Sequence, residues 1–299
     1  MEKIKNLYKN QGITGMCNKL RSYMTTPTGT GRQNFANKLT SKYVYRRYLN
    51  AKDVNTVIAN NYDSQFKSET IWICWLQGEE NAPKLVKKCI STIREKLSDK
   101  EIIIIDSDNF KEYVTLPDFI ISKWEIGDIS NTHFSDLLRL ELLIKYGGTW
   151  IDSTVFCTGN RFNNIVFESS LFFFSNELRD DDTIIGSSWL ITSAPQHPVL
   201  LLTRKILYNY WLKENKLKNY FLFHICFTLA INEFGEYKKE IIPVSNVNSH
   251  ILDLKINDQF NERVYLGICQ VSDFHKLSNK HKINLSIENS FYNQIMKGI

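Results

Sequence analysis

The segment 131–156, NTHFSDLLRLELLIKYGGTWIDSTVF, constrains the fold most, because it joins a helical pattern, a glycine pair and a strand pattern. Its apolar residues recur at helical spacing, at Leu137, Leu140, Leu143 and Ile144. Three candidate N-caps precede them, Asp128, Ser130 and Thr132. Gly147 and Gly148 end the pattern where a positive φ is needed, and Gly148 would let a ligand approach the backbone. We therefore predict a helix over 131–146 and a strand over 149–156.

Polar residues occupy two places in this segment that suit a ligand. Asp136 and Arg139 lie three residues apart and so project from one face of the predicted helix. The second place is the end of the predicted strand, at Asp152, Ser153 and Thr154. Ligands of open α/β folds sit at the carboxyl ends of strands, which predicts a site here. Taken alone, an acidic and basic pair on a helix is more often a surface salt bridge.

The rest of the chain alternates between strand and helix patterns. Apolar runs at 70–78 and 101–110 read as buried parallel strands. A helical pattern at 83–96 separates them, which predicts a right-handed βαβ unit. Later elements are predicted as strands at 171–175 and 187–193, helices at 197–211 and 220–234, and a late strand at 264–271. The predicted fold class is α/β with a mostly parallel central sheet.

The N-terminal region differs from the remainder in charge. Residues 1–50 hold ten basic residues against one acidic residue, a net charge of +9, whereas the whole chain carries +5 and residues 51–299 therefore carry −4. Helical patterns at 1–24 and 35–62 flank a loop at 25–34. We predict a basic helical extension over 1–68 and a domain over 69–299. The charge favours an anionic partner, either lipid or nucleic acid, but no nucleic-acid-binding motif accompanies it.

Composition and cysteine usage indicate the compartment. The 299 residues are 43% hydrophobic and 23% charged, which is typical of a globular protein. The six cysteines are scattered without a CxxC pair, which argues against zinc and for reduced thiols. No run of eighteen apolar residues occurs, and the N-terminus lacks the apolar core of a signal peptide. We expect a cytoplasmic protein.

The ordered set S-D-x-x-R-x-x-x-L-x-x-Y-G-G-x-W-x-D, from Ser135 to Asp152, is far more specific than any of its parts. It closely resembles the DXD-containing, sugar-binding region of glycosyltransferase family 32, particularly its capsular polysaccharide synthesis branch. The large glucosylating toxins carry a related pattern. The resemblance extends over about residues 70–282. It implies a GT-A fold, a Rossmann-like domain that binds a nucleotide sugar at the strand ends.

The resemblance also implies a metal ion. Asp152 falls on the first Asp of the motif and Thr154 on the second, so this chain departs from the pattern there. Mn2+ or Mg2+ bound here would neutralise the donor's diphosphate, although one carboxylate alone holds a cation weakly. A further contribution from the C-terminal region is implied, with His275 as a metal ligand and Lys276 and Lys280 as phosphate partners. The predicted metal ligands are Asp152, Thr154 and His275.

Two other acidic stretches compete for this role. Residues 106–108, Asp-Ser-Asp, match DxD literally after a predicted strand. Acidic residues in that position often form turns or cap helices instead. The triple carboxylate at 180–182 is more often a solvated loop than a cation site. We therefore place the site at Asp152.

The remaining donor contacts come from the first predicted strand and from the helix. In the resembling families an aromatic residue after the first strand stacks on the nucleobase, and Trp75 has that position. Asp136 and Arg139 match a pair that contacts the donor sugar and nucleotide, and with Asp152 they are the predicted catalytic residues. The predicted donor-binding residues are Trp75, Leu76, Gln77, Gly78, Asp136, Arg139, Gly148, Asp152, Ser153, Lys276 and Lys280.

The resemblance implies a retaining transfer of a hexose from a nucleotide sugar, with UDP favoured, to a lipid-linked oligosaccharide in capsular or surface polysaccharide synthesis. Such an acceptor lies at the inner face of the membrane, where anionic lipid would attract residues 1–50. Candidate acceptor contacts are Trp189, Gln196, His197 and His224. One alternative is a non-catalytic module that binds a nucleotide or glycan, which the missing second Asp favours. A protein acceptor is a second, and the absence of GxGxxG disfavours a dehydrogenase.

Overall fold

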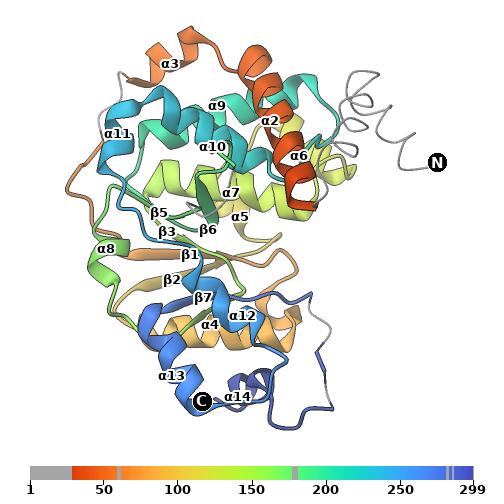
Figure 1. Cartoon of the computed structure of the whole chain (residues 1–299). Coiled ribbons are helices and arrows are strands. Elements are labelled where there is room, and N and C mark those ends of the chain that lie inside the picture. The colour runs from red at the N-terminus through yellow and green to blue at the C-terminus, as the bar shows by residue number, and fades with distance from the viewer. Residues whose placement is uncertain (1–28, 59–61, 177–180, 281–282, 285, 299) are drawn as a thin grey trace.

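A computed structural model describes residues 29–58, 62–176, 181–280, 283–284 and 286–298 (Figure 1). The elements up to residue 157 are α2 (Gly29–Tyr48), α3 (Ala51–Ile58), β1 (Thr70–Cys74), α4 (Lys84–Lys96), β2 (Glu101–Ile105), α5 (Phe110–Tyr113), α6 (Asp118–Glu125), α7 (Asn131–Tyr146), β3 (Gly148–Ile151) and β4 (Val155–Cys157). Those that follow are α8 (Asn163–Phe167), β5 (Leu171–Ser175), β6 (Gly186–Ser193), α9 (Pro198–Lys213), α10 (Leu222–Glu233), α11 (Gly235–Glu240), α12 (Ile251–Leu254), α13 (Glu262–Val271), β7 (Phe274–Lys276) and α14 (Phe291–Lys297).

The central sheet has five strands in the order β2-β1-β3-β6-β5. The first three are parallel, with Trp72 of β1 level with Ile103 of β2 and with Trp150 of β3. Strand β6 is antiparallel to both of its neighbours, so it alone runs against the other four strands of this sheet. The predicted fold class, an α/β domain with a mostly parallel central sheet, is confirmed. The carboxyl ends of β1 and β3 therefore meet at one edge.

Helices cover both faces of the sheet (Figure 1). On one face α7, α9 and α10 pack against a buried cluster that includes Trp72 of β1 and Trp150 of β3. On the other face α4 covers a second cluster, which takes Ile71 and Ile73 from the same strand β1. Successive strand side chains point to opposite faces, so one apolar strand contributes to two cores. The predicted helices at 83–96, 131–146, 197–211 and 220–234 correspond to α4, α7, α9 and α10.

A smaller layer lies on the far side of α4. Helices α12, α13 and α14 pack there around a third cluster, to which they contribute Leu252, Ile268 and Ile295 (Figure 1). Strands β4 and β7 form a separate antiparallel pair beside this layer, with Val155 level with Lys276. This pair links the middle of the chain to its C-terminal part.

Two predicted strands are corrected by the structure. The strand predicted at 149–156 is divided, because the chain turns after β3, where the Val155 N–H donates to the Asp152 carbonyl at 2.9 Å. The strand predicted at 264–271 is the helix α13. Its buried residues Tyr265 and Ile268 are three apart, and the Asn261 side chain caps its first turn. Because most residues of 264–271 are apolar, the helical spacing of the buried ones could not be recognised in the sequence.

The predicted N-terminal extension includes α2 and α3. Val44 and Tyr48 of α2 and Val57 of α3 are buried in the same cluster as α9 and α10. The loop predicted at 25–34 is corrected from Gly29 onward, where α2 begins; Gln33 donates to Asn37 one turn later at 2.8 Å. The helix predicted at 1–24 lies outside the described residues, and the division at residue 68 stays a prediction. None of the described helices has the length and apolar character needed to span a membrane.

Candidate functional site

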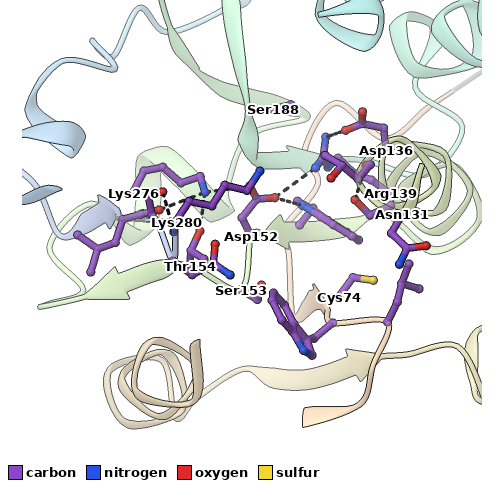
Figure 2. A pocket seen from close by; sticks show the side chains of 18 of the residues that line it. Cys74, Asn131, Asp136, Arg139, Asp152, Ser153, Thr154, Ser188, Lys276 and Lys280 are labelled. Carbon is purple, nitrogen blue, oxygen red and sulfur yellow. Dashed lines mark hydrogen bonds and ion pairs between the residues drawn. The ribbon is translucent and has the colours of Figure 1, made fainter. Parts of the chain in front are cut away.

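A cavity of about 550 Å³ opens at the carboxyl ends of β1 and β3 (Figure 2). Its walls come from the residues after these strands, the first half of α7, the start of α10, and β7 with the residues that follow it. This is the edge at which open α/β sheets bind ligands. Ten predicted site residues line it, namely Trp75, Leu76, Gln77, Asp136, Arg139, Asp152, Ser153, Thr154, Lys276 and Lys280.

Helix α7 presents its polar face to the cavity because its cap and its apolar stripe fix its rotation. Of the three candidate caps, Ser130 is the one used, and its hydroxyl accepts the His133 N–H at 3.3 Å. The four predicted apolar residues of the helix are buried. Asp136 and Arg139 therefore face the cavity side together, with side chains only 13% and 3% exposed. They are not a surface salt bridge.

Four charged side chains form a series across the cavity wall, which we call the ion chain: Asp136, Arg139, Asp152 and Lys276 (Figure 2). Arg139 donates from Nη1 to Asp136 at 2.8 Å and from Nη2 to Asp152 Oδ1 at 3.2 Å. The Asp152 Oδ2 atom lies 3.4 Å from Lys276 Nζ. Negative and positive groups alternate along the series, so each inner member has an opposite charge on both sides.

Aromatic rings hold the central guanidinium in place. The Arg139 guanidinium carbon lies 4.7 Å from the ring centre of Trp150 and 5.1 Å from that of Phe223. The Trp150 indole also donates to Asp152 Oδ1 at 2.9 Å, so it orients both partners of the pair. A planar guanidinium packed in this way keeps one nitrogen directed at Asp136 and the other at Asp152. Strand alternation could have placed Trp150 here from the sequence, which sequence reasoning missed.

A buried histidine supports Asp136 from behind. The Trp211 indole donates to His133 Nε2 at 2.9 Å, and His133 Nδ1 lies 3.2 Å from Asp136 Oδ2. An indole N–H only donates, so His133 Nε2 must accept and its proton sits on Nδ1, aimed at Asp136. Burial alone would raise the pKa of Asp136, but the Arg139 charge and the His133 hydrogen bond outweigh it and lower the pKa. Asp136 is thus held as a carboxylate.

Lys276 reaches the cavity through strand pairing. Because β7 pairs with β4, Lys276 lies beside the turn that carries Thr154, and the Leu277 N–H donates to the Thr154 carbonyl at 3.0 Å. The Lys276 ammonium donates to Thr154 Oγ1 at 2.5 Å. It therefore sits between the two residues that match the first and second positions of the acidic motif.

The loop after β1 forms the opposite wall. Trp75 lines the cavity and packs partly against the second core, whereas Trp72 lies in the first core. Gly78 does not line the cavity. It closes the turn with a φ of 81°, and its N–H donates to the Trp75 carbonyl at 2.9 Å. Its contribution is the turn that positions Trp75.

Two predicted site residues face elsewhere. His275 alternates with Lys276 on β7 and is fully buried on the other side, where its Nε2 lies 3.0 Å from Thr158 Oγ1. It does not line the cavity, which corrects its prediction as a metal ligand. Gly148 has a φ of 100°, and a Cβ there would lie 2.8 Å from the Trp72 indole nitrogen. Its close approach is to a neighbouring side chain, not to a ligand.

A divalent cation does not fit the side chains as they lie. Both Asp152 oxygens already face donors, and Thr154 accepts from an ammonium group. Within the described ranges, no three His, Cys, Asp or Glu side chains are grouped to hold a metal. Two unit charges 4 Å apart interact by about 4 kcal/mol at an effective dielectric constant of 20, and a dication doubles this repulsion from Lys276. The predicted Mn2+ or Mg2+ thus lacks a suitable set of ligands.

The competing acidic stretches serve structural roles. The Asp106 carboxylate accepts the N–H groups of Asp108 and Asn109 at 2.9 Å each, as in a turn. Asp181 is buried and accepts from Asn37 and Thr183. Of the residues that the structure describes in these two stretches, 106–108 and 181–182, none lines the cavity.

The predicted acceptor contacts divide. His224 lines the cavity, but Trp189 stacks on Phe174, and His197 caps α9 through its own ring nitrogen. Gln196 donates to the Ile144 carbonyl. Several cavity residues were missed because no motif marks them, namely Asn131, Thr132, Ser188, Tyr220, His250 and Asp253.

Comparisons with known proteins give a family and, among solved structures, distant neighbours. No curated protein matches the chain. A solved structure titled "PaToxG Glycosyltransferase" is 15% identical, covers 89% of this chain and 96% of its own, and has a TM-score of 0.41. A likeness this weak carries no argument. The family model described as capsular polysaccharide synthesis protein matches residues 25–295, nearly the whole chain. The chain therefore belongs to the capsular polysaccharide synthesis protein family.

Proposed function

We propose that the chain is a glycosyltransferase that transfers a hexose from a nucleotide sugar to a lipid-linked oligosaccharide during capsular or surface polysaccharide synthesis. Membership of the family supports the process. The observation that carries the chemistry is the ion chain, which brings Asp136, Arg139 and Asp152 together at the strand ends. A salt bridge with only a structural role would not need a cavity of about 550 Å³ beside it.

The donor would lie along the cavity with its base near Trp75 and its sugar near α7. An indole face at the cavity wall can stack on a nucleobase of any kind, so it provides affinity more than discrimination. Asp136 and Arg139 offer an acceptor and a donor group at fixed separation for sugar hydroxyls. The donor is UDP-linked by resemblance to the capsular branch of family 32.

The reaction exchanges one bond at the anomeric carbon for another. The bond to the phosphate oxygen breaks and its electron pair leaves with the nucleoside diphosphate. The acceptor hydroxyl oxygen forms the new bond to the anomeric carbon, and its proton passes to the departing diphosphate or to solvent. We propose retention of anomeric configuration, as the resemblance implies. Fixed charges near the leaving group lower this barrier because they need no reorganisation as charge develops. Arg139 is one cation placed for this work.

A lipid-linked acceptor would bring the protein to a membrane surface. We propose that it works in the cytoplasm and contacts anionic lipid through residues 1–50. Helix α2 is buried in the core, so deleting residues 1–50 would damage the fold. The sharper variant replaces Lys3, Lys5, Lys9, Lys19 and Arg21 by Gln. Co-sedimentation with anionic vesicles at low salt should fall in this variant, and unchanged binding would refute the contact.

Titration of a nucleotide panel into wild type and Asp152→Asn tests the donor site. We expect one diphosphate, UDP first, to bind the wild type and to bind the variant at least tenfold more weakly. Its sugars are then assayed for transfer. The matched control is Glu141→Gln, which alters a buried carboxylate paired with an arginine, Arg204, that does not line the cavity. Equal binding by wild type and Asp152→Asn would move the donor elsewhere.

The second candidate is a module that binds a nucleotide or glycan without transfer. Thr154 in place of an acidic residue favours it, because a motif that has lost its metal ligand often marks lost catalysis. The two candidates differ in turnover. A panel in which a nucleotide sugar binds but is neither transferred nor hydrolysed would select the module.

A further inference from the structure

The feature that the proposed function leaves unexplained is the ammonium group between Asp152 and Thr154. Lys276 Nζ lies 3.4 Å from Asp152 Oδ2, 2.5 Å from Thr154 Oγ1 and 3.4 Å from the Leu277 carbonyl. Its side chain is 24% exposed, and the exposed part faces the cavity. All three of these partner atoms are oxygens, as the ligands of a Mn2+ or Mg2+ ion would be.

The charges of the corner formed by Asp152 and Thr154 match a monovalent cation. Two acidic residues at positions 152 and 154 would supply two negative charges, which suits a divalent ion. Here Thr154 supplies a neutral hydroxyl, so of these two positions only Asp152 carries a carboxylate. Asp152 already shares that single charge with Arg139. A divalent ion would be poorly neutralised in this corner, whereas one ammonium group is matched.

A second lysine lies on the same side. Lys280 lines the cavity four residues after Lys276, and Figure 2 shows both side chains beside Asp152. In the part of the chain that the structure describes, no carboxylate forms a salt bridge with Lys280. A diphosphate entering the cavity therefore meets one fixed ammonium and one without a carboxylate partner.

We propose that Lys276 is the built-in cation of the donor site and takes the place of a divalent metal ion. The inference rests on the proposed function. The Lys276 ammonium donates to the oxygens of the nucleoside diphosphate and stabilises the negative charge that they gain when the anomeric bond breaks. Asp152 and Thr154 then serve to position Lys276 rather than to bind a metal. Lys280 adds a second contact to the same diphosphate.

Titration of UDP and GDP into the full-length protein, with EDTA or with Mn2+, tests the proposal directly. We expect the diphosphate that binds the wild type to do so equally, within twofold, in both conditions. Lys276→Met should weaken its binding at least tenfold. Binding of the corresponding nucleoside, which lacks phosphate, should stay within twofold, because Trp75 is untouched.

Control variants separate a charge effect from a folding effect. Lys276→Arg keeps the positive charge and should retain binding within about fivefold, with a melting temperature near that of Lys276→Met. Lys96→Met removes an exposed lysine of α4 that pairs only with its neighbour Glu95, and it should change nothing. An equal loss in Lys276→Met and Lys96→Met would overturn the proposal.

A reconstructed motif tests whether the ammonium occupies the place of a metal. The double variant Thr154→Asp, Lys276→Gln has two acidic residues and no lysine there. Its diphosphate affinity should rise at least tenfold on adding Mn2+, whereas the wild type should not respond. A double variant indifferent to Mn2+ would contradict the equivalence of the two cations.

The outcomes also separate this inference from the proposed function. Wild-type binding that EDTA abolishes and Mn2+ restores would overturn the role of Lys276 but leave the donor site standing. A nucleotide sugar that is transferred without metal, and no longer after Lys276→Met, supports both. Absence of binding by every nucleotide of the panel would overturn both.

Discussion

Two groups of ion-paired residues flank the strand pair β4–β7, and they differ in what remains unsatisfied. Asp273, directly before β7, is fully buried and accepts from the Arg161 side chain and from the backbone N–H groups of Arg161 and Phe162. Its oxygens have no free face. The ion chain lies on the other side of the pair and opens onto the cavity, with the Asp152 side chain 27% exposed and Lys276 24% exposed. The Asp273 group holds structure together, and the ion chain has capacity left for a ligand.

The largest effect should follow from breaking the closed group. Asp273→Ala leaves two backbone N–H donors, of Arg161 and Phe162, without an acceptor and an arginine without its carboxylate. We expect it to lower the free energy of unfolding by about 3–4 kcal/mol, measured by urea denaturation. Arg161→Met leaves the buried Asp273 carboxylate with its two backbone N–H donors, so we expect a smaller loss of about 2 kcal/mol. If both variants lost the same free energy of unfolding, the bonds from the two backbone N–H groups to Asp273 would not contribute as described.

Breaking the open ion chain should instead act on activity. Arg139→Lys keeps the charge but cannot bridge Asp136 and Asp152 with two nitrogens. We expect the transfer rate to fall about 100-fold, which corresponds to about 2.7 kcal/mol, with a small change in melting temperature. Arg204→Lys is the matched control. Arg204 donates to Glu141 at a distance of 3.0 Å, and neither residue lines the cavity. A comparable rate loss in Arg204→Lys would erase the distinction between the two kinds of pair.

A pH titration should sharpen the comparison further. His275 faces the closed side of β7, and burial lowers its pKa to about 4. The unfolded chain takes up this proton near pH 6.5, so the stabilising effect of the neutral ring is complete above that pH and is lost as the pH falls from 6.5 to about 4. We expect a loss of about 3 kcal/mol across this window. His275→Gln should reduce that slope, and an unchanged slope would assign it to other groups.

The smallest effect should come from Gly267 in α13, the helix whose last turn accepts hydrogen bonds from Arg161. A Cβ at Gly267 would meet nothing within 4 Å, so Gly267→Ala should stabilise the protein by about 0.5–1 kcal/mol through the helix alone. Nucleotide binding should not change. Gly148→Ala is the opposing control, because its Cβ would meet the Thr70 carbonyl at 2.7 Å. Destabilisation by both would mean that α13 tolerates less than its open surface indicates.

Much of the fold followed from the sequence because its signals are local. The spacing of leucines in α7, the apolar runs of β1 and β2, and the glycine pair after α7 each act over a few residues. The motif from Ser135 to Asp152 lies on two consecutive elements, so Arg139 and Asp152 were expected together and are found 3.2 Å apart.

The missing part of the site depends on a distant pairing. Strands β4 and β7 have three residues each, too few for a periodic signal, and their register alone decides that Lys276 faces the cavity while His275 faces inward. A shift of one residue would exchange these two sides. Sequence reasoning placed both residues near the site but could not assign their faces. Nor could it find His133, whose role depends on Trp211, a residue of another helix.

The pairing of β4 with β7 also has a consequence for the order in which the protein matures. Strand β4 leaves the ribosome long before its partner Phe274–Lys276 is made, and at a synthesis rate of roughly 5–20 residues per second the wait is on the order of ten seconds. During that time β4 has an unpaired edge, and Asp152 lacks its lysine. The five-stranded sheet is complete well before then. The corner that holds Asp152 and Lys276 is therefore completed only after the five-stranded sheet, and a chain interrupted before residue 276 contains that sheet without Lys276.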